Sequence, residues 1–201
     1  MSVRICIGGR IGAGKTSVAN LFTQHFGIAR LSFVTPIRQE ICDTFGVTMD
    51  DLTLPGLKER YRPLLVAWGP ARNISTGDPH YWAKMLLRRF EGDGDAVVDD
   101  LRRPEEFDHL RAQAAPHNWI LVWLDMPVER SRGWLEHNGV TDPRKQDEAL
   151  TAITETALQP YVDQGKFDIV LDAARPPEAI FYDLEAQLLA MGVPLQEVRR
   201  C

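Results

Sequence analysis

The sequence predicts an α/β fold, a three-layer domain in which helices flank a five-stranded, mostly parallel sheet. Three observations lead to this prediction. Short apolar runs rich in β-branched residues alternate with helical patterns along the chain. One run, Trp119–Leu124, is almost continuously apolar, as in a strand buried on both faces. The 201 residues and the hydrophobic fraction of 44% suit one compact core, so we expect a single domain over residues 1–201.

The first half of the chain contains two predicted strands and four predicted helices. Val18 and Phe22 recur at helical spacing after a glycine-rich turn, which indicates an amphipathic helix. Thr35 supplies a helix cap, and the proline that follows suits a first helical turn. Gly69 is the predicted end of the third helix. The predicted strands are Val3–Ile7 and Arg30–Phe33, and the predicted helices are Lys15–Phe26, Thr35–Phe45, Leu57–Trp68 and Pro79–Phe90.

The second half alternates strands and helices in the same way. The turn residues Gly92, Asp93 and Gly94 lead into its first strand. A polar stretch over 138–147 follows a short helix, and the two together predict a small lid over about residues 128–147. The predicted strands are Ala96–Asp99, Trp119–Leu124 and Phe167–Leu171, and the predicted helices are Glu105–Ala114, Val128–Glu136 and Glu178–Met191.

Charge and cysteine usage exclude several classes of protein. The net charge of -5 disfavours a surface that binds nucleic acid broadly, although a local basic groove stays open. No apolar run approaches the roughly 20 residues of a membrane span, and the first residues have the pattern of a strand rather than of a signal peptide. Cys6, Cys42 and Cys201 are far apart and odd in number, which indicates reduced thiols. We therefore expect a cytoplasmic protein without a membrane partner, and a homodimer stays open.

Residues 9–16 fit the pattern G-x-x-x-x-G-K-[ST] at every fixed position. The alternative is a chance glycine-rich turn, but an apolar strand precedes this one and an amphipathic helix follows it. In such a cradle backbone N–H groups and the helix N-terminus bind phosphates, the lysine reaches the β- and γ-phosphates, and the hydroxyl ligates Mg²⁺. The predicted site for ATP and Mg²⁺ consists of Gly9, Arg10, Ile11, Gly12, Ala13, Gly14, Lys15, Thr16 and Ser17, with Thr16 and Asp99 as the metal candidates.

The cradle alone does not identify the reaction, because GTPases, ATPases and kinases share it. The chain has no N-K-x-D pattern for guanine, and it is short for a helicase or a large ATPase. A small kinase with the P-loop kinase fold is the remaining hypothesis. Planar guanidinium groups suit the recognition of an acceptor phosphate. Taken singly, each arginine is also compatible with a solvated surface. The candidates beside predicted helix starts and strand ends are Arg38, Arg62, Arg72 and Arg102.

Blocks along most of the chain resemble the bacteriophage deoxynucleoside monophosphate kinases. The segment LSFVTPIRQEICDTFGV resembles a family block with a proline, a basic residue and a helix. The segments ERYRPLLVAWGPARN and DPHYWAKML resemble an arginine-containing helix and the aspartate–aromatic–tryptophan helix after it. AVVDDLRRPEEFDHL is similar to the family's D-x-R block with a glutamate four residues beyond the arginine. ITET resembles a short block that carries a glutamate, here Glu155, and lacks the histidine that can precede it.

The resemblance implies roles for residues on the acceptor side. It implies that arginines grip the acceptor monophosphate, and it places Glu106 in the same block as Arg102. Trp82 is a candidate for stacking on a base, with the hydrophobic core as the alternative. If the chain is phage-encoded, its place is the host cytoplasm. The substrate-binding residues implied are Arg38, Arg62, Arg72, Trp82, Arg102 and Glu106.

Acidic residues and lid arginines complete the catalytic candidates. Asp99 and Asp100 end the third predicted strand beside the cradle, where one of them could hold a Mg²⁺-bound water or orient an arginine. The alternative for Asp99 is an ordinary strand-end turn. The lid arginines could offset charge that develops during transfer, or they could lie on a solvated helix face. The catalytic candidates are Lys15, Asp99, Asp100, Arg102, Arg130 and Arg132, and Arg144 is a further lid arginine.

Three functions stay open at this point. The first is transfer of the γ-phosphoryl group of ATP to a deoxynucleoside 5′-monophosphate, which gives the diphosphate. The second is phosphorylation of a hydroxyl acceptor, either a nucleoside or a hydroxymethylated pyrimidine in DNA of the 5-hydroxymethyluracil type, with Asp99 or Asp100 as the base. DNA is a partner only in this second case. The third is a nucleotide-binding regulatory ATPase. The expected partner is otherwise a small nucleotide substrate.

Overall fold

The computed structural model describes residues 2–54, 56–90, 94–113 and 119–196. The sequence predictions that involve Gly92, Asp93, Ala114 and Cys201 lie outside this part of the chain. The chain divides into two compact units. Unit 1 comprises residues 1–30 and 93–201, and unit 2 comprises residues 31–92. Each unit is described by itself.

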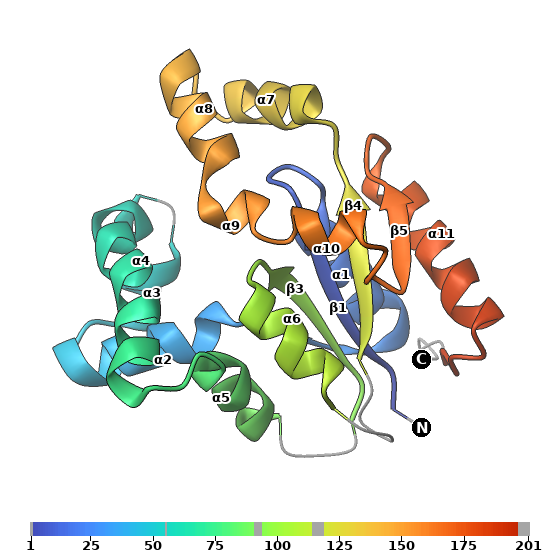
Figure 1. The fold of residues 1–201 in the computed structure, drawn as a ribbon, viewed down its shortest axis with the longest axis horizontal. Coiled ribbons are helices and arrows are strands. Elements are labelled where there is room, and N and C mark those ends of the chain that lie inside the picture. The colour runs from blue at the N-terminus through green and yellow to red at the C-terminus, as the bar shows by residue number, and fades with distance from the viewer. Residues whose placement is uncertain (1, 55, 91–93, 114–118, 197–201) are drawn as a thin grey trace. The chain divides into compact units, whose positions relative to one another are not determined.

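The sheet has five strands in the order β2-β3-β1-β4-β5. Figure 1 labels β3, β1, β4 and β5 of this sheet. β1 pairs in parallel with both β3 and β4, and β4 pairs in parallel with β5. The predicted α/β fold with a five-stranded parallel sheet is therefore confirmed. The strands are β1 (Arg4–Gly9), β2 (Ala29–Leu31), β3 (Ala96–Leu101), β4 (Ile120–Asp125) and β5 (Ile169–Asp172).

The helices of unit 1 follow the predicted pattern, with α8, α9 and α10 as additions between the predicted lid helix and the last strand. The polar stretch over 138–147 contains the start of a helix. The carboxylate of Asp142 accepts a hydrogen bond from the backbone N–H of Arg144 at 2.9 Å, and Pro143 occupies the first turn, so a cap and a proline begin the helix despite its polar sequence. The helices are α1 (Lys15–Phe26), α6 (Pro104–Arg111), α7 (Val128–His137), α8 (Pro143–Thr151), α9 (Ile153–Thr156), α10 (Gln159–Asp163) and α11 (Pro177–Ala190).

In the part that the structure describes, unit 2 consists of helices and their connections after Leu31, the last residue of β2. The prediction that Gly69 ends a helix is wrong, because that helix continues to Thr76. Gly77, with φ of 65°, takes the left-handed conformation that ends it, whereas the backbone of Gly69 stays helical. The carbonyl oxygen of Gly69 accepts a hydrogen bond from the indole of Trp82 at 2.9 Å. The helices are α2 (Val34–Phe45), α3 (Met49–Thr53), α4 (Leu57–Thr76) and α5 (Tyr81–Arg89).

Apolar layers on the sheet of unit 1 fix the carboxyl ends of its strands. Phe22 of α1 and Phe181 of α11 are almost fully buried, and their ring centroids lie 5.0 Å apart. They belong to a core that also contains alternate residues of β1, β4 and β5. A second aromatic group surrounds Phe167, whose ring centroid lies 5.0 Å from that of Phe107 and 5.4 Å from that of Trp123. Among the described residues no helix is long and apolar enough to cross a membrane.

Candidate functional site

The phosphate loop, defined as residues 10–14, joins the end of β1 to the start of α1. Gly12 has φ of 81°, a conformation that residues with side chains rarely adopt. A Cβ atom on Gly12 would also lie 2.8 Å from Cγ of Trp134, because the indole packs directly on the loop. The glycine is therefore required both by its backbone conformation and by the space that Trp134 takes.

Lys15 curls back from the start of α1 over the phosphate loop. Its side-chain Nζ donates hydrogen bonds to the carbonyl oxygens of Gly9 at 2.6 Å and Arg10 at 2.8 Å. The residue is only 8% exposed. Burial is the main cause that lowers the pKa of Lys15 to about 8, and the positive charge of Arg102 adds to the effect. The ammonium group thus lies at the first residues of the loop, within a site that disfavours its charge until an anion is present.

Asp99 links the start of α1 to the end of β2. Its Oδ2 accepts hydrogen bonds from the Thr16 hydroxyl at 2.6 Å and from the Arg30 guanidinium at 2.8 Å. The carboxylate is buried, with the residue 4% exposed. The predicted strand end at Asp99 is wrong, because β3 continues to Leu101. The register shifts after the pair of Cys6 with Val98: the next pair is Gly8 with Leu101, so β3 has one more residue than β1 between the two pairs. The side chain of Leu101 is buried, and β3 therefore continues to this residue.

The arrangement of Thr16 and Asp99 suits Mg²⁺ that arrives with a nucleotide. Mg²⁺ prefers oxygen ligands and keeps several waters, with one or two protein groups and phosphate oxygens completing its shell. The Thr16 hydroxyl is such a ligand, and Asp99 can orient it or accept from a metal-bound water. No group of three His, Cys, Asp or Glu side chains within the described ranges could hold a metal ion by itself. The residues present therefore fit a shared site, in which phosphate oxygens supply the remaining ligands.

A charged cluster from distant segments contacts the first residues of the phosphate loop. Glu155 of α9, only 7% exposed, accepts a hydrogen bond from the backbone N–H of Ile11 at 2.6 Å through Oε2. Its Oε1 forms an ion pair with the guanidinium of Arg102. Next to it, Gln159 of α10 accepts a hydrogen bond from the guanidinium of Arg10 at 2.6 Å. The α9–α10 segment therefore holds the loop at two consecutive residues.

Glu106 fixes the backbone from which Arg102 projects. Its Oε2 accepts hydrogen bonds from the backbone N–H groups of Arg102 and Arg103, each at 3.0 Å. Burial raises the pKa of Glu106 to about 8, against the opposing effect of these hydrogen bonds, and the nearby charge of Asp100 raises it further. Arg102 is thus held at its backbone by Glu106 and at its guanidinium by Glu155. Asp100 itself lies on β3 and is half-buried.

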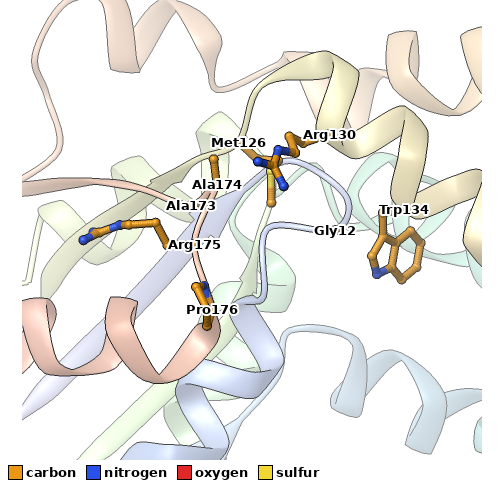
Figure 2. Close-up of a pocket in the computed structure, with 8 residues that line it drawn as sticks. All are labelled: Gly12, Met126, Arg130, Trp134, Ala173, Ala174, Arg175 and Pro176. Carbon is orange, nitrogen blue, oxygen red and sulfur yellow. The ribbon is translucent and has the colours of Figure 1, made fainter.

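A cavity of about 360 Å³ adjoins the phosphate loop at Gly12 (Figure 2). Arg130 and Trp134 come from α7, whereas Arg175 and Pro176 come from the segment between β5 and α11. An ion pair of 2.7 Å with Asp183 holds the guanidinium of Arg175. Flat guanidinium groups and apolar side chains together suit a planar aromatic ring. The cavity can therefore take the base of a nucleotide whose phosphates lie in the loop.

The three lid arginines differ in their surroundings. Arg130 lines the cavity beside the loop. Arg132 joins the two lid helices, with an ion pair of 2.7 Å to Asp147 and a hydrogen bond of 3.2 Å to Gln146. Arg144 lies exposed in the first turn of α8. The structure thus gives Arg132 a bracing contact and Arg130 a place at the cavity, and the catalytic role of both stays a prediction.

One of the candidates in unit 2, Arg72, belongs to a cluster around Glu40 of α2. Its carboxylate forms an ion pair with Arg72 at 2.8 Å and accepts hydrogen bonds from the indole of Trp68 at 3.3 Å and the hydroxyl of Tyr81 at 3.4 Å. Arg72 is thus paired with an acidic side chain, while its own side chain stays 41% exposed. Trp82 is only 5% exposed and has the surroundings of a packing residue, so its stacking on a base stays a prediction.

The other two arginines of unit 2 have different surroundings. Arg62 pairs with Glu59 at 2.6 Å on the exposed side of α4. Arg38 is half-buried on α2.

Several residues at the site were not predicted from the sequence. They are scattered, so no local spacing marks them. One signal was available for Arg175, because ligands of parallel α/β sheets bind outside the carboxyl ends of the strands and this residue lies in the segment between β5 and α11. The residues in question are Arg30, Trp134, Gln159 and Arg175.

No protein-family model matches the chain, and no curated protein matches it. Solved structures are similar in fold. Shikimate kinase from Acinetobacter baumannii, in complex with shikimate, has a TM-score of 0.55 and 12% identity, over 96% of this chain and 97% of that chain. A gluconokinase from Sinorhizobium meliloti 1021 has a TM-score of 0.51 and 16% identity, over 94% and 93% of the two chains. A sugar kinase from Janibacter sp. HTCC2649 has a TM-score of 0.51 and 18% identity, over 96% of each. The predicted P-loop kinase fold is therefore confirmed, and specificity for a deoxynucleotide rests on the sequence resemblance alone.

The contact of Gly12 with Trp134 predicts a specific pattern of stability. Gly12→Ala should lower the free energy of unfolding by about 2–4 kcal/mol, from left-handed strain and the clash with the indole. Gly14→Ala is the matched control, because its φ is 78° but the nearest atom to an added Cβ is 3.7 Å away. Urea denaturation should show the smaller loss for Gly14→Ala. Trp134→Ala should restore part of the stability of Gly12→Ala; equal losses at both glycines would show that the indole does not restrict the loop.

The lowered pKa of Lys15 predicts proton uptake on nucleotide binding. With a folded pKa of about 8, Lys15 is partly neutral at pH 8, and phosphate oxygens beside Nζ will raise that pKa. Binding of MgADP at pH 8 should therefore take up a fraction of a proton, and affinity should fall as pH rises through 8. Calorimetry in two buffers of different ionisation enthalpy measures the uptake. Lys15→Arg is the control and should abolish it; undiminished uptake in that variant would assign the proton to another group.

Proposed function

We propose that the chain is an ATP-dependent phosphotransferase that acts on a small acceptor. The observation that carries this proposal is the phosphate loop with Lys15 buried against its first residues and Arg102 beside them, since Glu155 contacts both Arg102 and Ile11. The cavity at Gly12 supports a nucleotide donor. The fold shared with shikimate, gluconate and sugar kinases supports the same class of reaction.

The proposed acceptor is a deoxynucleoside 5′-monophosphate. The support is the series of sequence blocks that resemble phage deoxynucleoside monophosphate kinases, together with an arginine beside the phosphate loop that two glutamates hold. The backbone of Arg102 is fixed by Glu106 and its guanidinium by Glu155. Fixed guanidinium forks recognise phosphate at low entropic cost.

A monophosphate acceptor sets modest chemical demands on the protein. Its second pKa is near 6, so its oxygen is already a nucleophile at neutral pH and no general base is needed. The chain has to align the two phosphates, exclude water and neutralise charge at the transferring phosphorus. Lys15 and Arg102 supply positive charge for this, and Thr16 and Asp99 would hold Mg²⁺, which neutralises charge on the phosphate oxygens when bound.

A hydroxyl acceptor is the second candidate function. It is favoured by the fold comparisons, in which one protein binds shikimate and another is a gluconokinase. Such an acceptor needs a carboxylate base. Asp99, which accepts hydrogen bonds from Thr16 and Arg30, and Asp100 on the same strand are the two candidates for that role. A hydroxymethylated pyrimidine in DNA belongs to this class, but the net charge of -5 gives a DNA acceptor little support.

The proposal is tested by ADP release from MgATP across a panel of acceptors. The panel contains the four common deoxynucleoside monophosphates, their nucleosides, shikimate, gluconate, and DNA with and without hydroxymethylated pyrimidines. We expect turnover with monophosphates that Lys15→Ala abolishes. Arg102→Ala should lower kcat/KM for the monophosphate by about 10²–10³-fold, because it removes a charged contact with phosphate.

Arg111→Ala is the matched control for that variant. Arg111 also forms an ion pair, at 2.9 Å with Asp168, but Asp168 contacts the amino end of β4 rather than the phosphate loop. The kcat/KM of Arg111→Ala should stay within about threefold of the wild-type value. Turnover with a hydroxyl acceptor alone would contradict the monophosphate proposal and favour the second candidate. ADP release that no acceptor stimulates would favour a regulatory ATPase.

A further inference from the structure

The Glu155 carboxylate binds the phosphate loop as an anionic ligand would. One oxygen accepts from the backbone N–H of Ile11 and the other pairs with Arg102. Backbone N–H groups of a glycine-rich loop and an adjacent guanidinium are the groups that bind phosphate oxygens in a nucleotide site. Its side chain is only 6% exposed, so this carboxylate belongs to the interior of the site rather than to its rim.

The position of Lys15 shows which end of the phosphate loop Glu155 occupies. The lysine of such a loop reaches the β- and γ-phosphates, while the first turn of the following helix serves the phosphates nearer the nucleoside. Here Nζ lies against the carbonyl oxygens of Gly9 and Arg10, at 2.6 and 2.8 Å. The N–H that Glu155 accepts from belongs to the next residue, Ile11. Glu155 therefore lies at the end of the loop that serves the γ-phosphate.

The charges around Glu155 are also those that a γ-phosphate requires. The Arg102 guanidinium is bound to it directly, and its negative charge acts on Lys15, whose pKa it raises against the effect of burial. A phosphate at this place and the Glu155 carboxylate would compete for the same N–H and the same guanidinium. Two such anions together would repel each other strongly in a buried site.

We propose that Glu155 is a positioning residue that takes the place of the γ-phosphate in the resting protein and is displaced when ATP binds. When Glu155 is displaced, the Arg102 guanidinium loses its ion pair with Glu155 and contacts the phosphates instead. Arg102 can therefore bind phosphate only after the triphosphate is bound. ADP has no γ-phosphate and leaves the contacts of Glu155 in place. The inference rests on the proposed use of ATP. It adds that ATP binds first and that Arg102 contacts phosphate afterwards.

A fixed brace is the alternative role for Glu155, and the two roles predict different affinities. A brace would hold the loop and Arg102 throughout the reaction, so its loss would weaken ATP and ADP alike. A displaceable anion competes only with the γ-phosphate, so its loss would strengthen ATP binding and leave ADP unchanged. The ratio of the two affinities therefore separates the roles, and a general loss of structure would not raise it.

The test is calorimetric titration of wild type and Glu155→Gln with MgADP and with a non-hydrolysable MgATP analogue. We expect Glu155→Gln to lower the Kd of the ATP analogue about tenfold, because a charged hydrogen bond contributes about that much to binding. The Kd of ADP should stay within about twofold of its wild-type value. Gln159→Ala is the matched control, because it removes an uncharged side chain of the same segment that accepts a hydrogen bond from Arg10. This control variant should leave the ratio of the affinities for the ATP analogue and for ADP unchanged.

A second variant keeps the test decisive if Glu155→Gln folds poorly. Glu155→Asp keeps the charge but is one methylene shorter, so it cannot reach both Ile11 and Arg102, and its ratio should lie between those of wild type and Glu155→Gln. An unchanged ratio in both variants, or parallel weakening of both nucleotides, would overturn the inference while leaving the kinase proposal standing. Failure of the wild type to bind the ATP analogue would instead overturn the proposed function and the inference with it.

Discussion

The buried ammonium group of Lys15 is the constraint on which the rest of the site depends. A cation that is 8% exposed costs free energy unless groups around it compensate its charge. Two carbonyl oxygens of the chain before it accept its hydrogen bonds, and the charges of Asp99 and Glu155 act in its favour. The compensation is incomplete, and the remaining cost of burying the charge is seen in the lowered pKa of Lys15. A phosphate beside Nζ would relieve that penalty, which gives the site its preference for anions.

Two hydrogen-bond networks, each built on one buried carboxylate, lie beside this centre. One runs through Asp99, which joins Thr16 to Arg30 and secures the side where Mg²⁺ would bind. The other runs through Glu155, which joins Ile11 to Arg102 on the side where transfer would occur. Both carboxylates are buried, so each depends on its hydrogen-bond partners to offset the cost of removing it from water. Such paired networks respond strongly when a ligand replaces one member, and this is the basis for an exchange at Glu155.

The sequence was informative where the determinants are local. The helix Lys15–Phe26 was predicted with the bounds it has, because the glycine pattern and the apolar spacing lie within a short segment. The prediction at Gly69 was wrong because a glycine can either end a helix or continue it. Which of the two occurs at this position depends on distant contacts such as that with Trp82. The role of Glu155 could not be predicted for the same reason. Its partners lie 144 and 53 residues away, and only the fold brings them together.

The central claim, transfer of a phosphoryl group from ATP to a monophosphate, is tested most directly by ³¹P NMR of the reaction mixture. Wild-type protein, MgATP and the four deoxynucleoside monophosphates are followed together, with Lys15→Ala in parallel. The account predicts that monophosphate signals decline while the paired resonances of a new nucleoside diphosphate grow beside those of ADP, in the wild type only. New phosphomonoester signals after addition of a hydroxyl acceptor, or inorganic phosphate as the sole product, would contradict it.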